Sequence, residues 1–217
     1  MRKSTVIISF LLLALSGCTS TIQDTYFNMW EKLGVEKRDI LVDRVEDAQE
    51  TQQEAQQQFS SALEEFSALI NFDGGELEDV YNNLNDQFEA SKSTAEDVSN
   101  RIDKVESVAG SLFREWESEL EQITNQNLRR DSQKKLSSTK RNYESLVRSM
   151  RKVEASMAPV LSALQDNVLY LKHNLNANAV GALKGELNTI QKDVKDLIAE
   201  MSAAIKQSDE FIATIKS

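Results

Sequence analysis

The chain has 217 residues, and 25 Lys and Arg stand against 35 Asp and Glu, so its formal net charge is −10. This acidic balance argues against nucleic acid as a partner, because phosphate binding needs clustered Lys and Arg. It argues equally against a broad face that binds anionic bilayers. Pro159 is the only proline and glycine is sparse. Together with abundant Ala, Glu, Gln, Lys and Leu, this composition predicts an all-α fold.

The beginning of the chain has the pattern of a secretory signal. Arg2 and Lys3 form a short basic start before an apolar run from Val6 to Leu15, and this run is too short to span a bilayer. Small residues then lead to Cys18, the only cysteine. We predict a signal peptide over residues 1–17. One alternative is an ordinary secretory signal in which the cysteine occurs by chance. The other is a transmembrane helix.

The end of this signal, Leu15-Ser16-Gly17-Cys18, resembles the lipobox of Gram-negative lipoproteins. The resemblance implies diacylglycerol on the thiol of Cys18, cleavage before this residue, and acylation of the new amino group by a fatty acid such as palmitate. Two or more acyl chains give stable anchoring. Thr19 rather than aspartate follows the cysteine, which favours the periplasmic face of the outer membrane over the inner membrane.

An aromatic segment lies in residues 18–35, between the predicted anchor and the first predicted helix. Tyr26, Phe27 and Trp30 make it the densest aromatic cluster of the chain. One interpretation is a short helix at the bilayer interface, where Trp and Tyr are favoured. The other is a cap over the open end of the helical domain. The sequence leaves both interpretations open.

Residues 36–217 carry apolar side chains at alternating intervals of three and four residues. This spacing places one apolar stripe on one face of a helix and is typical of coiled-coil packing. The stripes and the polar breaks between them predict helices at about 36–71, 76–123, 128–175 and 179–216. Short breaks predict an elongated antiparallel four-helix bundle. The middle two helices are longer, which predicts a two-helix extension at one end.

Two kinds of residue interrupt this pattern. Pro159 lies inside the third predicted helix, but the stripe continues in phase across it, so we expect a kink rather than a chain reversal. Polar residues stand in the stripes at Gln52, Ser91, Thr139 and Ser208. Buried polar residues at such positions set register and oligomeric state, whereas small ones allow helices to approach closely. A homo-oligomer therefore stays open.

Few residues suit catalysis or metal binding. His173 is the only histidine, and we interpret it as a helix-end residue that the helix dipole favours. A zinc or haem site with several His or Cys ligands is excluded by count, as is a di-iron site with two Glu-x-x-His pairs. The segment 73–76 contains Gly74 and Gly75 but lacks the ligand spacing of a calcium loop. We predict no enzyme, no catalytic residue, no metal and no cofactor.

Arg129, Arg130, Lys134 and Lys135 form a basic patch in an otherwise acidic chain. The plain interpretation is a solvated helix face with ion pairs between residues four apart. The alternative is a docking face for an acidic partner or for anionic groups of the cell envelope.

Three segments of the chain carry a family resemblance: Lys37–Val42, Phe66–Gly75 and Leu171–Ala177. They resemble a domain-of-unknown-function family of Gram-negative bacterial envelope lipoproteins, over most of the mature chain. The family carries no assigned activity. The resemblance therefore implies the compartment and the helical fold, and no catalytic residue.

We predict a lipid-anchored periplasmic scaffold or spacer that binds the membrane through Cys18 and an unknown envelope protein through its helix faces or its far end. With the N-terminus at the membrane, the break after the second predicted helix would lie near the membrane, and the other two breaks far from it. The alternative function is a carrier for a lipid or small apolar ligand in the bundle interior around Pro159. Met150 and Met157 would line such a cavity, although core packing also explains them.

Overall fold

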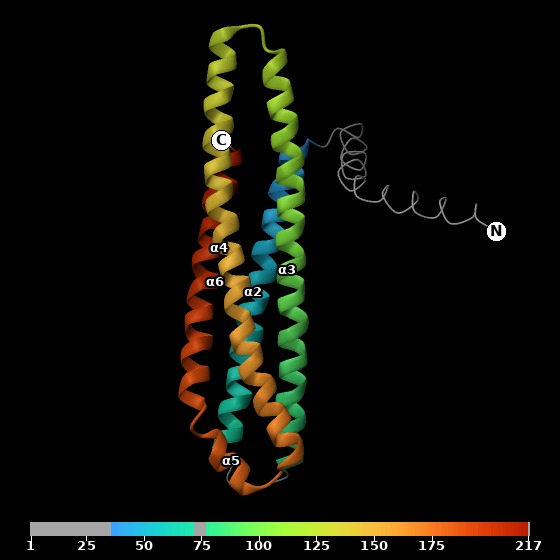
Figure 1. Ribbon diagram of the computed structural model, residues 1–217, viewed down its shortest axis with the longest axis vertical. Helices are drawn as coiled ribbons and strands as arrows, with labels where there is room; N and C mark the ends of the chain where they lie inside the picture. Colours follow the sequence, from blue (N-terminus) through green and yellow to red (C-terminus); the bar gives the residue numbers. More distant parts are fainter. Residues whose placement is uncertain (1–35, 72–76, 217) are drawn as a thin grey trace, which may run out of the picture.

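The computed structural model describes residues 36–71 and 77–216. These residues form five α-helices and no strand, so the predicted all-α fold is confirmed. Figure 1 shows the long helices lying side by side in an elongated rod, with a short helix at one end. The helices are α2 (Lys37–Ile70), α3 (Leu77–Gln122), α4 (Gln126–His173), α5 (Ala177–Leu183) and α6 (Leu187–Lys216).

The prediction of one continuous helix at 179–216 is wrong, because α5 and α6 share this stretch. The side chain of Asn176 begins α5 early by accepting hydrogen bonds from the backbone N–H groups of Asn178 (3.0 Å) and Ala179 (3.2 Å). Gly185 lies in the turn between the two helices. Glycine disfavours a helix interior by about 1 kcal/mol relative to alanine, so the chain breaks where the apolar stripe alone predicted continuity.

Each long helix packs on two others: α2 and α4 both contact α3 and α6. Polar contacts show which ends meet. Lys37 at the start of α2 lies 3.1 Å from Glu115 near the end of α3. The side-chain amide of Gln56 donates to the carbonyl of Ile198 on α6 at 3.0 Å. The first residues of α2 therefore lie beside the last part of α3.

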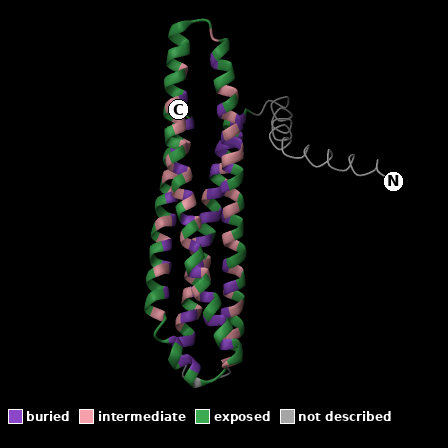
Figure 2. Ribbon diagram, viewed as in Figure 1, coloured by how far each residue is buried: buried purple, intermediate pink, exposed green. Residues whose placement is uncertain are grey.

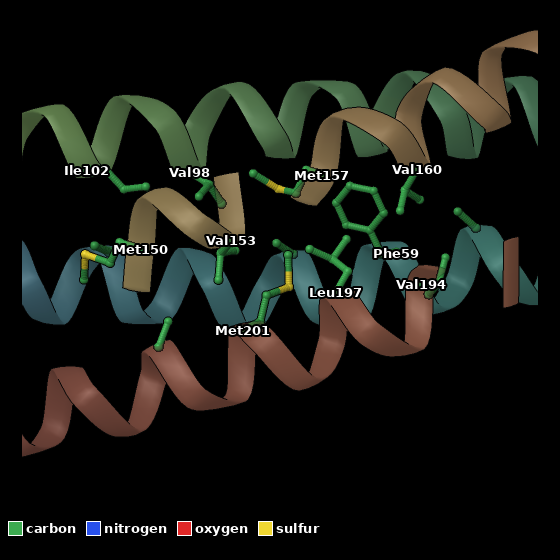
Figure 3. Close-up of a cluster of buried hydrophobic side chains, with 14 of the residues drawn as sticks. Phe59, Val98, Ile102, Met150, Val153, Met157, Val160, Val194, Leu197 and Met201 are labelled. Carbon is green, nitrogen blue, oxygen red and sulfur yellow. The ribbon is translucent and has the colours of Figure 1, made fainter. Parts of the chain in front are cut away.

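Apolar side chains from all five helices form one core along the rod. Figure 2 shows the buried residues on the inward sides of the helices. In Figure 3, Phe59 of α2, Met157 of α4 and Leu197 of α6 lie in one cluster. Helix α4 continues through Pro159, and Val160 after it is almost fully buried. The chain therefore does not reverse at this proline.

The polar residues of the stripes fall into two groups. Ser91 and Ser208 are buried, and their hydroxyls donate to the carbonyls four residues earlier at 2.7 and 3.1 Å. Thr139 is half-buried. Gln52 is fully buried, and neither polar atom of its side chain has a hydrogen-bond partner. A buried amide without a partner costs about 1–3 kcal/mol, so Gln52 lowers the stability of the core.

Helices α3 and α4 extend beyond the first residue of α2 and the last residue of α6 (Figure 1). We call this projecting part, residues 117–138, the tip hairpin. Leu120 and Leu136 are buried in it, and at its base the indole N–H of Trp116 donates to the hydroxyl of Ser132 at 2.8 Å. Across the described ranges, no helix combines the length and the apolar character that crossing a membrane requires.

Candidate functional site

Four predicted site residues precede the described part of the chain. Cys18, Tyr26, Phe27 and Trp30 all lie before residue 36, where the description begins. Lipidation of Cys18 and an interfacial role for the aromatic residues therefore stay predictions.

The four residues of the predicted basic patch all lie on the tip hairpin. Arg129, Arg130, Lys134 and Lys135 occupy the first turns of α4 and are exposed. The ammonium of Lys135 lies 3.4 Å from the carboxylate of Asp131, four residues earlier. Such exposed pairs contribute little to stability.

The patch stands at the positive end of a helix dipole. Asn125 caps α4 by accepting hydrogen bonds from the N–H groups of Asn127 (3.0 Å) and Leu128 (3.3 Å), and the first turn of α4 contains no acidic residue. Cations near a helix N-terminus are unfavourable by about 0.3–1 kcal/mol each. Stability of α4 therefore does not account for Arg129 and Arg130.

The α3 side of the tip hairpin has the opposite charge. Glu117, Glu119 and Glu121 follow one another at alternate positions. At the base of the tip hairpin, the ammonium of Lys140 on α4 lies 2.5 Å from the carboxylate of Glu117. The tip hairpin therefore has a basic side on α4 and an acidic side on α3.

Further along the rod, an ion-pair network joins α3 to α4. The guanidinium of Arg151 contacts the carboxylates of Asp103 (2.5 Å), Glu106 (2.6 Å) and Glu154 (2.8 Å). The hydrogen bond to Glu106 is the main cause that raises the pKa of Arg151. Burial alone would raise the pKa of Glu154, but hydrogen bonds from Ser99 and Arg151 outweigh it and lower this pKa. These groups hold fixed charges and serve as a clamp between helices.

A groove at the base of the tip hairpin is the feature that sequence reasoning missed. It encloses about 580 Å³ where α2 begins and α6 ends. The unequal lengths of the predicted helices could have indicated this groove. The apolar stripes of α3 and α4 continue beyond the ends of α2 and α6, which leaves them uncovered there. The groove is lined by Glu36, Arg38, Leu112, Glu115, Trp116, Glu119, Lys135, Ser138, Thr139, Thr214 and Ile215.

The remaining candidates are not brought together. His173 is the exposed last residue of α4, whereas Met150 and Met157 are buried in the core of the rod. Within residues 36–71 and 77–216, no group of three or more His, Cys, Asp or Glu side chains is arranged to hold a metal ion.

Neither the curated proteins nor the solved structures contain a match to this chain. Residues 26–215 match a family whose description is protein of unknown function. The match takes in the aromatic segment, the tip hairpin and nearly all of the described helices. It confirms the predicted membership of a domain-of-unknown-function family. The chain belongs to the DUF2959 family of proteins of unknown function.

Proposed function

We propose that this protein is a lipid-anchored periplasmic spacer whose long helices pack as an antiparallel, coiled-coil-like four-helix bundle and which holds a partner protein in the cell envelope. The observation that supports it is the place where α2 begins. Lys37 lies beside Glu115, next to the base of the tip hairpin. A chain tethered through Cys18 would therefore carry the tip hairpin near the membrane and the α5 end far from it (Figure 1).

The dimensions of the rod suit a spacer. Helix α4 has 48 residues, and at 1.5 Å per residue it is about 70 Å long. Ion pairs along the rod tie neighbouring helices together, including Arg101 with Asp47 at 3.0 Å and Lys152 with Glu200 at 3.0 Å. Helices joined in this way keep the two ends of the molecule at a fixed separation.

The basic patch supplies the docking surface of the proposed spacer. Its cations lie where the dipole of α4 disfavours them, and local conflicts of this kind occur at functional sites. The favoured partner is an acidic face of an envelope protein, which would approach Arg129 and Arg130. The methionines of the interior support packing over carriage of a ligand, since Met150 and Met157 are at most 2% exposed.

Fractionation of cells tests the tether. A Cys18→Ala variant should leave the membrane fraction, because acyl chains supply the anchor that the described helices lack. A Ser16→Ala variant, with the cysteine kept, should stay in the membrane fraction. A Cys18→Ala protein that remains particulate like the unsubstituted chain would refute the tether.

Photocrosslinking in intact cells tests the docking surface. A photoreactive residue at Leu128, on the tip hairpin, should capture a defined envelope protein, and Arg129→Glu with Arg130→Glu should abolish this product. A photoreactive residue at Leu175, near α5, serves as the comparison at the far end. Capture that is unaffected by the charge reversal would refute the basic patch as the docking surface.

A further inference from the structure

The groove at the base of the tip hairpin lies where the core changes from four long helices to two. Along most of the rod, each apolar stripe is covered by neighbouring helices on both sides. At the groove, α2 begins and α6 ends, so beyond it the stripes of α3 and α4 lose two of their partners. Leu112 and Trp116 of α3 are only partly buried there, beside Ile215 of α6.

The groove has the size and the lining of a site for large apolar side chains. Its volume of about 580 Å³ falls within the range of about 300–1,000 Å³ that is usual for binding pockets. Leu112, Trp116 and Ile215 give it apolar walls, and charged side chains of both signs, among them Arg38 and Glu119, border these walls. An amphipathic segment with aromatic residues on one side would match this combination.

The chain itself supplies such a segment at this position. Glu36 lines the groove, and the aromatic segment is joined to it through only a few residues of chain. An extended chain spans at most about 3.3–3.6 Å per residue, which puts Leu33 within about 10 Å and Trp30 within about 20 Å of Glu36. The family match begins at Tyr26, after the predicted anchor, so the matched region contains this segment together with the helices.

We infer that the aromatic segment Tyr26–Leu33 docks into the groove at the base of the tip hairpin and closes the open end of the core, with Trp30 and Leu33 against Leu112, Trp116 and Ile215. The inference goes beyond the proposed spacer function and does not depend on lipidation. It assigns an occupant to a site that the helices alone leave open. Docking would also fix the distance between Cys18 and the rod, because fewer residues remain between them.

Cysteine crosslinking of the full-length chain in isolated membranes tests this docking. A chain with Trp30→Cys and Thr139→Cys pairs the segment with the groove, and a chain with Trp30→Cys and Leu128→Cys is the matched control. Leu128 is 62% exposed on the same tip hairpin and does not line the groove. Mild oxidation followed by thiol tagging and peptide mass analysis measures the fraction of each pair that is joined.

The groove pair should become oxidised on the order of tenfold faster than the control pair, because docking raises the effective concentration of the two thiols above that of a flexible tether. Equal rates for the two pairs would overturn the docking. Loss of the membrane tether in the Cys18→Ala variant should leave the fast rate unchanged, so failure of the spacer proposal and failure of the docking are distinguishable.

Fluorescence distinguishes the groove from the bilayer as the place of the aromatic segment. The chain has two tryptophans, so a Trp116→Phe variant keeps Trp30 as the sole emitter and an aromatic ring in the groove. Reconstituted into phosphatidylethanolamine and phosphatidylglycerol vesicles with brominated acyl chains, Trp30 should keep its emission. Strong quenching by these lipids would place Trp30 at the bilayer interface and overturn the docking.

Discussion

Replacing Gln52 with methionine should stabilise the protein. Three other glutamines of α2 reach partners: Gln49 donates to Asp209 at 2.7 Å, Gln56 donates to Ser202 at 2.8 Å, and Gln58 donates to the side chain of Gln87 at 2.8 Å. Gln52 alone among these is fully buried, and both its polar atoms lack a partner.

The expected gain follows from the cost of an unpartnered amide. Removing it should recover about 1–3 kcal/mol, and a swap that conserves volume costs less than about 1.5 kcal/mol in packing. Methionine has a similar length and adapts to irregular space. We therefore expect Gln52→Met to raise the free energy of unfolding by about 1–2 kcal/mol. For a domain of this size the melting temperature should rise by about 2–8 °C.

Equilibrium denaturation in guanidinium chloride, followed by far-UV circular dichroism on the detergent-solubilised chain, measures this gain. The matched control is Gln53→Met, because Gln53 is exposed and is the next residue along the chain. The control should change the free energy of unfolding by less than about 0.5 kcal/mol. If Gln52→Met is less stable than the control, the amide of Gln52 has a partner in the folded protein and the reasoning is refuted. Sedimentation of the same variant tests the oligomeric state, since a polar residue in a stripe specifies oligomeric state at a cost in stability.

Two further predictions concern the interface between α3 and α4. Arg151→Gln should lower the free energy of unfolding by about 1 kcal/mol, because three carboxylates lose their common cation. The control Arg148→Gln, at an exposed position of the same helix, should change this free energy by less than half as much. Equal losses for the two variants in denaturation curves would contradict the role of Arg151 in joining α3 to α4. Burial, and next the charge of Glu106, raises the pKa of Tyr143 to about 12 from its usual value of 10.0. A raised pKa in the folded state contributes stability that is fully present below pH 10 and is lost as the pH rises toward 12. Tyr143→Phe should therefore flatten the alkaline limb of the stability profile, and an unchanged limb would contradict the assigned cause.

The long helices were predictable because their stripes repeat over many turns. The spacing from Leu136 to Leu171 continues in phase through Pro159, and α4 is one helix through this proline. The break before α6 was harder to predict, because the stripe continues across Gly185 and only the cap at Asn176 and the glycine oppose it. The helix break there depends on the cap at Asn176 and on Gly185, and the periodic pattern of apolar residues contains neither signal.

The candidate site was predictable only in part. Arg129, Arg130, Lys134 and Lys135 are four charges within seven residues of one helix, so their place on one short stretch of that helix followed from the sequence. The groove joins residues of four helices that are as far apart as Glu36 and Ile215. Finding the groove requires knowing where α2 begins and α6 ends relative to α3 and α4. This alignment depends on tertiary contacts such as that between Lys37 and Glu115.

Both ends of the described chain lie at the same end of the rod. Lys216 near the C-terminus lies 2.8 Å from Glu46 on α2, and Figure 1 places the last residues of α6 beside the first turns of α2. A fluorescent reporter fused after the final residue would therefore report the surroundings of the tip hairpin. A reporter inserted in the turn at 184–186 would sample the opposite pole of the molecule. Labels at these two places would report the surroundings of the two ends of the rod separately.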